Sequence, residues 1–132
     1  MNIEVGCLCG EVRISLDGEP LSQLYCHCDD CQAVHGAAYV GVALFPSEAV
    51  KIIKGQPVKW TYKSNPRSRC KNCGTILYAE PPGKPFLGVK ANLIPSGMFK
   101  PACHVQCQHA VLPVVDDLPH YKGFHPNETV SW

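Results

Sequence analysis

Cys26-His27-Cys28-Asp29-Asp30-Cys31 is the stretch around which the rest of the chain is organised. Its three thiols lie close enough together for one turn of backbone to direct all of them to a single point. A structural zinc ion usually has four protein ligands, whereas a catalytic zinc ion has three and keeps one coordination position open. The hexapeptide offers three clear ligands and no obvious fourth one nearby, so it predicts an open zinc site.

Two further cysteine pairs stand in distant parts of the chain. Cys7-Leu8-Cys9-Gly10 and Cys70-Lys71-Asn72-Cys73-Gly74 each present two thiols at a turn and end in glycine. Glycine readily adopts a positive φ, which lets the chain fold back so that backbone N–H groups face the sulfur atoms. The pairs together predict one closed zinc site, whose metal binding is coupled to folding. Its ligands are Cys7, Cys9, Cys70 and Cys73.

Two alternatives to this closed site stay open at this point. The four thiols can be separate buried cysteines, or Cys70 and Cys73 can form a redox pair. A redox CxxC motif normally opens a helix in an α/β context. Here strand-like residues 75–78 follow the motif at once, so we favour the closed zinc site.

The hexapeptide also has an alternative interpretation, a second structural zinc whose fourth ligand comes from farther along the chain. In the open arrangement, a thiol that enters the free position is deprotonated by the charge of the metal and becomes a nucleophile. We favour the open arrangement, because three ligands and an exchangeable position suit catalysis. The candidates for a fourth ligand are His35, Cys103, His104, Cys107 and His109.

The run from Cys103 to Cys107 is the most ambiguous one. Residues four apart in a strand share a face, so Cys103 and Cys107 are expected to point together and His104 the opposite way. Free cysteine packs well in a core, and this is the favoured interpretation. A third metal site that includes His109 is the alternative.

The remaining polar residues near the hexapeptide are weaker candidates. Asp29 and Asp30 can carry protons or only cap the turn. His27 lies between two predicted ligands and is expected to be exposed. His120 and His125 receive no role.

Composition restricts the classes of protein to consider. A chain of 132 residues predicts a single domain, 1–132. A formal net charge of +1 argues against binding to nucleic acid or to an anionic membrane. The sequence shows neither a bilayer-spanning apolar run nor a secretion signal, so we expect a cytoplasmic protein. In that reducing environment, nine cysteines indicate metal ligands or buried thiols rather than disulfides.

Short β-like runs separated by glycine and proline predict an all-β domain. Helical turns are expected only at 29–35, 47–49 and 116–121. The expected strands are 11–16, 23–25, 37–45, 50–54, 58–62, 75–78, 86–89 and 111–115.

With these motifs in order, the chain resembles the glutathione-dependent formaldehyde-activating enzyme family, which includes centromere protein V. The resemblance covers nearly the whole length. Beyond the three cysteine motifs, it runs through Gly36-Ala37, Thr75, His104 and 118–121. It implies a β-tent fold, in which two antiparallel sheets lean together with zinc at their junctions. It also implies that Cys7, Cys9, Cys70 and Cys73 bind a structural zinc and that Cys26, Cys28 and Cys31 bind a catalytic one.

The activity that the resemblance implies is the addition of glutathione to formaldehyde, formally a carbon–sulfur lyase reaction run in reverse. We therefore expect a zinc enzyme with two zinc ions per chain that acts on a small thiol and an aldehyde. Candidates for the proton transfer are His35, Asp29 and His104. No cluster of basic residues is evident for the carboxylates of glutathione, although Lys84, Lys90 and Arg69 are available singly. The alternative from another class is a non-catalytic zinc module that binds a protein partner.

Overall fold

The computed structural model describes residues 1–124 and 128–132, so His125 lies outside the described residues. The described chain is mostly β. Its helical segments are α1 (Asp29–His35), η1 (Ser47–Ala49), η2 (Ala91–Leu93) and η3 (Cys107–His109). Its strands are β1 (Ile3–Gly6), β2 (Arg13–Leu16), β3 (Ser22–Cys26), β4 (Val40–Pro46), β5 (Val50–Lys54), β6 (Val58–Tyr62), β7 (Asn65–Arg69), β8 (Ile76–Ala79), β9 (Phe86–Lys90) and β10 (His104–Val105).

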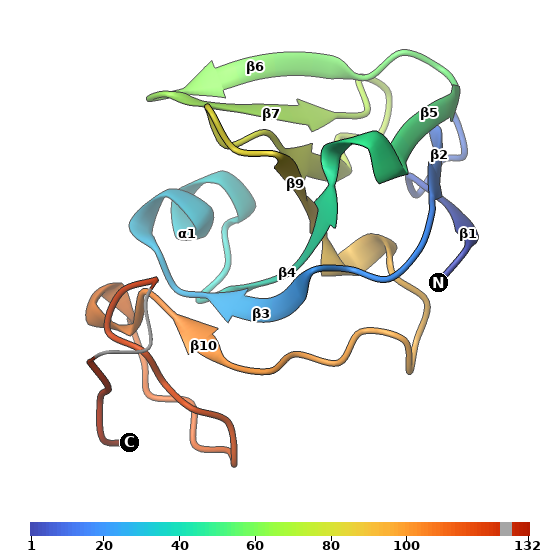
Figure 1. The fold of residues 1–132 in the computed structure, drawn as a ribbon. Helices are drawn as coiled ribbons and strands as arrows, with labels where there is room; N and C mark the ends of the chain where they lie inside the picture. The colour runs from blue at the N-terminus through green and yellow to red at the C-terminus, as the bar shows by residue number, and fades with distance from the viewer. Residues whose placement is uncertain (125–127) are drawn as a thin grey trace.

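The strands form two open sheets. One has three strands in the order β1-β2-β5, and the other has seven in the order β10-β3-β4-β9-β8-β7-β6. Neighbours pair antiparallel except β10, which runs parallel to β3. Figure 1 shows α1 enclosed by the large sheet, with β6 and β7 on one side of it and β3 and β4 on the other. The predicted mostly-β, two-sheet architecture is confirmed, with one parallel pair that the sequence did not indicate.

Each face of the large sheet covers its own apolar cluster, because successive side chains of a strand point to opposite faces. Ala43 and Phe45 of β4 pack with Ile14 and Leu16 of β2, so this face joins the two sheets. On the other face, a smaller cluster contains Cys26, Cys31, Val40, Val42 and Val105. The second cluster includes two of the predicted metal ligands, so the three-cysteine hexapeptide is built onto this face.

The helical turn predicted at 29–35 is α1. Cys28 is its N-cap, and the Cys28 sulfur accepts a hydrogen bond from the backbone N–H of Cys31. Gly36 ends the helix in the left-handed region at φ 58°, where a residue without a Cβ is favoured. None of the described helices has the length and apolar character that crossing a bilayer requires.

Two predicted elements near the C-terminus are wrong. Residues 111–115 form bends and irregular backbone rather than a strand, and Val111 and Val115 are 64% and 77% exposed. Residues 116–121 are not helical; there His120 forms a bridge with His104 of β10. The tail is held by backbone hydrogen bonds to β10, from His104 N–H to the Pro119 carbonyl and from Tyr121 N–H to the His104 carbonyl.

Candidate metal sites

The first cysteine cluster joins the turn after β1 to the turn after β7. The Sγ atoms of Cys7, Cys9, Cys70 and Cys73 all lie within 4.8 Å of one another. The Sγ–Sγ distance is 3.6 Å from Cys7 to Cys9 and 3.7 Å from Cys9 to Cys70. Four sulfurs at the Zn–S distance of about 2.3 Å in a tetrahedron are about 3.8 Å apart. The cluster therefore has the dimensions of a four-thiolate zinc site.

The turns of this cluster have the geometry that their glycines predicted. Gly10 and Gly74 have φ values of 82° and 77°, and the backbone N–H of Val12 donates to Cys7 Sγ at 3.3 Å. Cys73 Sγ lies 3.1 Å from the hydroxyl of Thr75, and this hydrogen bond lowers the pKa of the Cys73 thiol to about 5. These contacts favour thiolates, the form in which cysteine binds a metal.

The redox alternative for Cys70 and Cys73 has no support in this geometry. Cys73 is followed by Gly74 and then by strand β8, so the motif does not open a helix. All nine cysteines are unpaired. Cys7 and Cys9 lie against the CxxC pair across the junction of two turns, which is a metal-site arrangement and not that of a helix N-terminal redox pair.

The second cysteine cluster is formed by three residues that are close together in the sequence. Cys26 ends β3, Cys28 caps α1, and Cys31 lies in the first turn of that helix. Their Sγ atoms also lie within 4.8 Å of one another. The strand-to-helix turn therefore brings together the three thiols that the hexapeptide predicted.

The pKa values of the thiols in this cluster are shifted in opposite directions. Hydrogen bonds from Cys26 and then Cys28 lower the pKa of Cys31 to about 3. The same contacts, with Cys28 first and then Cys31, raise the pKa of Cys26. One sulfur is therefore a thiolate stabilised by its two neighbours, and a cation at this point would compete with the two remaining protons.

Among the residues that the structure describes, no histidine, cysteine or carboxylate joins this cluster as a fourth potential ligand. His104 belongs to a different group, and neither Cys103 nor Cys107 lies in any candidate metal group. Cys107 is buried, and desolvation raises the pKa of its thiol to about 11. The three thiols therefore lie close enough together to hold a metal ion, and the thiol of Cys107 packs in the interior.

His27 does not lie where the sequence indicated. It was expected to be exposed, but only 1% of it is accessible to solvent. Its Nε2 lies 2.8 Å from His104 Nδ1, and its ring stacks on Tyr39 with centroids 4.9 Å apart. Burial, and then the neighbouring His104, lower the pKa of His27 to about 4. The imidazole is therefore neutral at pH 7.

A buried hydrogen-bonded chain continues from His27 to the C-terminal tail. His104 Nε2 lies 2.7 Å from Asp116 Oδ2, and this contact lowers the pKa of Asp116. An ionised carboxylate only accepts, so His104 donates Nε2–H to Asp116, while its Nδ1 shares one hydrogen bond with Nε2 of His27. His120 Nε2 lies 2.8 Å from the Val114 carbonyl.

His104, Asp116 and His120 also have the proximity of a metal site. However, both ring nitrogens of His104 and Nε2 of His120 are engaged in the hydrogen bonds just described. The arrangement explains why His104 is fully buried without being a ligand of the three-cysteine cluster. A paired histidine buried in this way stabilises the turn that carries Cys26 and Cys28.

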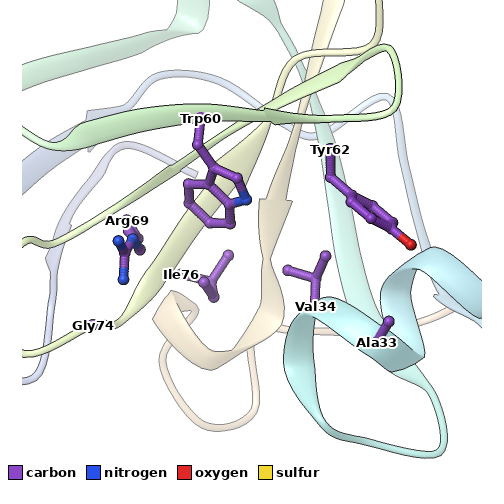
Figure 2. Close-up of a pocket in the computed structure, with 7 residues that line it drawn as sticks. All are labelled: Ala33, Val34, Trp60, Tyr62, Arg69, Gly74 and Ile76. Atoms are coloured by element: carbon purple, nitrogen blue, oxygen red, sulfur yellow. The ribbon is translucent and has the colours of Figure 1, made fainter.

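A cleft of about 620 Å³ opens between α1 and the hairpin of β6 and β7. Figure 2 shows Trp60 and Tyr62 extending from β6 toward Val34 of α1, with Arg69 at the side of Gly74. The guanidinium carbon of Arg69 lies 5.3 Å from the centre of the Trp60 ring. The cleft therefore runs from the helix that carries Cys31 toward the turn that carries Cys73, and its walls are aromatic, aliphatic and cationic.

One ion pair ties the hairpin to the helix beside the cleft. Lys63, at the hairpin tip, places its Nζ 2.7 Å from Asp30 Oδ1. Asp29 instead accepts a hydrogen bond from the backbone N–H of Asp30 at 2.9 Å. Both carboxylates thus have structural partners, but the residue that caps the helix is Cys28 rather than either aspartate.

His35 has a different environment from the other histidines. Its Nε2 is buried and has no hydrogen-bond partner within residues 1–124 and 128–132. Burial, and then the charges of Lys90 and Arg67, lower the pKa of His35 to about 4. An unpartnered ring nitrogen at the end of α1 is free to exchange a proton with a bound ligand.

Comparison with known proteins shows similarity in sequence to one family and in fold to a solved structure. A family model described as glutathione-dependent formaldehyde-activating enzyme matches residues 2–109. A crystal structure of a Rhodobacter sphaeroides protein superposes with a TM-score of 0.60 at 16% identity, over 71% of this chain and 89% of that chain. This structure supports the fold alone. No curated protein matches the chain significantly.

Proposed function

Because the chain belongs to the glutathione-dependent formaldehyde-activating enzyme family, we propose that it is a zinc-dependent carbon–sulfur lyase or synthase. Its substrates are a small thiol, such as glutathione, and an aldehyde, such as formaldehyde. The observation that carries the proposal is the cluster of Cys26, Cys28 and Cys31, which converges on one point with no fourth ligand among the described residues. A catalytic zinc ion typically has three protein ligands and one open coordination position.

The two clusters have different roles in this proposal. Cys7, Cys9, Cys70 and Cys73 hold a structural zinc, and residues 1–132 fold around it as one domain. Cys26, Cys28 and Cys31 hold the catalytic zinc. The unpaired state of all nine cysteines supports a cytoplasmic location, where thiols stay reduced.

The proposed reaction forms one carbon–sulfur bond. A bound zinc supplies a positive charge that lowers the pKa of a thiol entering its open position. The thiol sulfur bonds to the carbonyl carbon, the C=O π pair becomes an alkoxide, and the proton that left the thiol ends on that oxygen. His35 Nε2 is the atom that we assign to carry this proton, because it is buried and unpartnered. The reverse path breaks the hemithioacetal.

His104 and Asp29 were the other candidates for this step. Both ring nitrogens of His104 are held by His27 and Asp116, which makes it a positioning residue for the metal-binding turn. Asp29 accepts a hydrogen bond from the backbone N–H of Asp30 at the exposed start of α1. The cleft lined by Trp60, Tyr62 and Arg69 adjoins the helix of Cys31 and has the surface to hold the remainder of the thiol substrate.

The proposal is tested by the acceleration of exchange between glutathione, formaldehyde and their adduct, measured by NMR exchange spectroscopy on metal-loaded protein. Cys28→Ser is expected to lower the catalysed rate by about 100-fold or more, a scale typical of losing one group that stabilises developing charge. Elemental analysis should show two zinc ions per wild-type chain and one in the variant.

The matched control is Cys103→Ser, a partly buried cysteine outside both clusters. It should keep both zinc ions and the wild-type rate. Wild-type protein that carries two zinc ions but accelerates no thiol–aldehyde pair would overturn the proposal and favour a non-catalytic zinc module that binds a protein partner.

A further inference from the structure

Two basic residues share the sheet face that carries Cys26. Strand pairing places Cys26 opposite Val40 on β4, and Lys90 of β9 opposite Val42. Residues two apart on a strand share a face, and so do directly paired residues on neighbouring strands. Cys26, Val40, Val42 and Lys90 therefore point to the same side of the sheet.

The same relation extends to β7. Gly88 lies two residues before Lys90 and pairs with Ala79 of β8, and Ala79 pairs with Arg67. Arg67 thus lies on the face of Lys90 and Cys26. This is the face that α1 covers with Cys31.

Both basic side chains are buried there. Lys90 is 3% exposed and Arg67 is 2% exposed. In the part of the chain that the structure describes, Arg67 Nε has no hydrogen-bond partner. Its guanidinium donates from Nη1 to the Asn65 carbonyl at 3.3 Å, and its central carbon lies 5.9 Å from the centre of the Tyr62 ring. Among the described residues, neither Lys90 nor Arg67 forms an ion pair with a carboxylate.

Buried cations of this kind require a counter-charge, because desolvation of an unpaired charge is costly. For Lys90, burial lowers the pKa, and the nearby sulfurs of Cys31, Cys26 and Cys28 oppose this effect, so these sulfurs are the negative groups next to its ammonium. The guanidinium of Arg67 is charged at every physiological pH. The same face of the sheet therefore carries the thiol of Cys26 and two buried basic side chains.

The charges define what the fourth position accepts. Three thiolates with one divalent metal ion carry a net charge of minus one. Lys90 and Arg67 change this to plus one, and a single negative charge on a further ligand makes the site neutral. A neutral ligand leaves a buried positive charge uncompensated, which costs free energy in a medium of low polarity.

We propose that Lys90 and Arg67 turn the open position beside Cys26, Cys28 and Cys31 into an anion site, which selects a thiolate or another monoanion over a neutral ligand. The inference deepens the proposed function and rests on its three-cysteine metal site. In the carbon–sulfur reaction, the same two positive charges would favour the thiolate form of the substrate sulfur and the negative charge that develops on the carbonyl oxygen. They act as specificity-determining and positioning residues.

The experiment uses the full chain loaded with Co²⁺, whose visible absorption reports the fourth ligand. Azide serves as the monoanion and imidazole as the neutral ligand of similar size, and each is titrated at pH 7.5. Lys90→Met keeps the length and apolar stem of the side chain. It should weaken azide binding by about tenfold or more and change imidazole binding by less than about twofold, because only the anion loses a buried charge partner.

Lys90→Arg restores the charge and should recover most of the azide affinity. Arg67→Gln removes the other positive charge and should also weaken azide binding. Lys84→Met, which removes an exposed lysine of the proline-rich loop, is the matched control and should bind both ligands as the wild type does. Each variant is first checked for its Co²⁺ content and its far-ultraviolet circular dichroism.

An azide-to-imidazole affinity ratio that is the same in wild type, Lys90→Met and Arg67→Gln would overturn the inference. The readout is ligand binding and not turnover, so its failure is distinguishable from failure of the proposed enzyme activity. Protein that shows the Lys90-dependent preference for azide but no thiol–aldehyde exchange would retain the anion site and lose the proposed reaction.

Discussion

The two cysteine clusters use the same ligand type for different ends. Cys7, Cys9, Cys70 and Cys73 link turns from distant parts of the chain, next to the core between the two sheets. Cys26, Cys28 and Cys31 lie within one strand-to-helix turn, beside the buried Lys90 and Arg67. In the proposed function, the first cluster supplies all four ligands of its metal ion, whereas the second supplies three and leaves one position to another ligand. Stability is therefore expected to depend on the former and chemistry on the latter.

The largest effect should come from the closed cluster. Cys70→Ser removes a fully buried ligand, and structural zinc binding contributes about 10 kcal/mol or more to folding in small zinc domains. This is comparable with the whole stability of an ordinary domain. We expect Cys70→Ser to lose its cooperative thermal transition in circular dichroism, and a variant that melts like the wild type would remove the contrast between the two clusters.

Metal removal should separate the clusters in a single sample. The three-cysteine cluster has fewer ligands, so a mild chelator should take about one metal ion per chain while the protein stays folded. The expected fall in Tm for this first ion is a few degrees, and removal of the second should unfold the chain. Chelator titration followed in parallel by elemental analysis and by thermal melting checks this order, and simultaneous loss of both ions would contradict it.

Acid should destabilise the folded protein through protonation of His35. The folded-state pKa of His35 is about 4, below its usual value near 6.5, because of burial. The unfolded chain therefore binds a proton between these values that the folded chain does not, and the stabilising contribution of neutral His35 is lost as pH falls from about 6.5 to 4.

His35→Gln tests this dependence, because glutamine does not titrate. The free energy of unfolding of wild type relative to the variant should decrease as pH falls through this range, measured by urea unfolding at several pH values. A difference that stays constant from pH 7 to pH 4 would show that the burial of His35 contributes nothing to acid sensitivity.

The smallest effect is expected at the ion pair between the hairpin and the helix. Lys63 is exposed, and isolated surface ion pairs contribute little to stability. Lys63→Ala should leave the Tm unchanged within error and instead alter KM for the thiol, because the hairpin borders the cleft. A lower kcat at constant KM would indicate that the pair affects the chemical step instead.

The sequence was sufficient where the determining contacts are local. Three thiols within one turn predicted both α1 and the cluster around Cys28. The paired turns with glycine predicted that Cys7 and Cys70 meet, because each half carries its own geometry. Both clusters could therefore be derived from spacing and from the preferences of single residues.

The errors fall where distant segments determine the outcome. His27 is buried because His104, 77 residues away, pairs with it, and no local pattern contains that contact. The apolar residues 111–115 lack a partner strand, so their composition alone gave the wrong prediction. Lys90 was recognised only as a single basic residue, since its position beside Cys26 follows from the register of β3, β4 and β9.

The short parallel pairing of β10 with β3 limits how far the chain can be truncated from its C-terminus. Backbone N–H groups of Tyr25 and His27 donate to the carbonyls of Cys103 and Val105, and Trp132 lies against both His27 and His120. The family match ends at residue 109, yet a fragment that stops there would retain every cysteine and lose Asp116, His120 and Trp132. Sequence similarity thus marks a shorter unit than the one that physically supports the turn of Cys26 and Cys28, and expression of the matched segment alone would remove the Trp132 ring from His27.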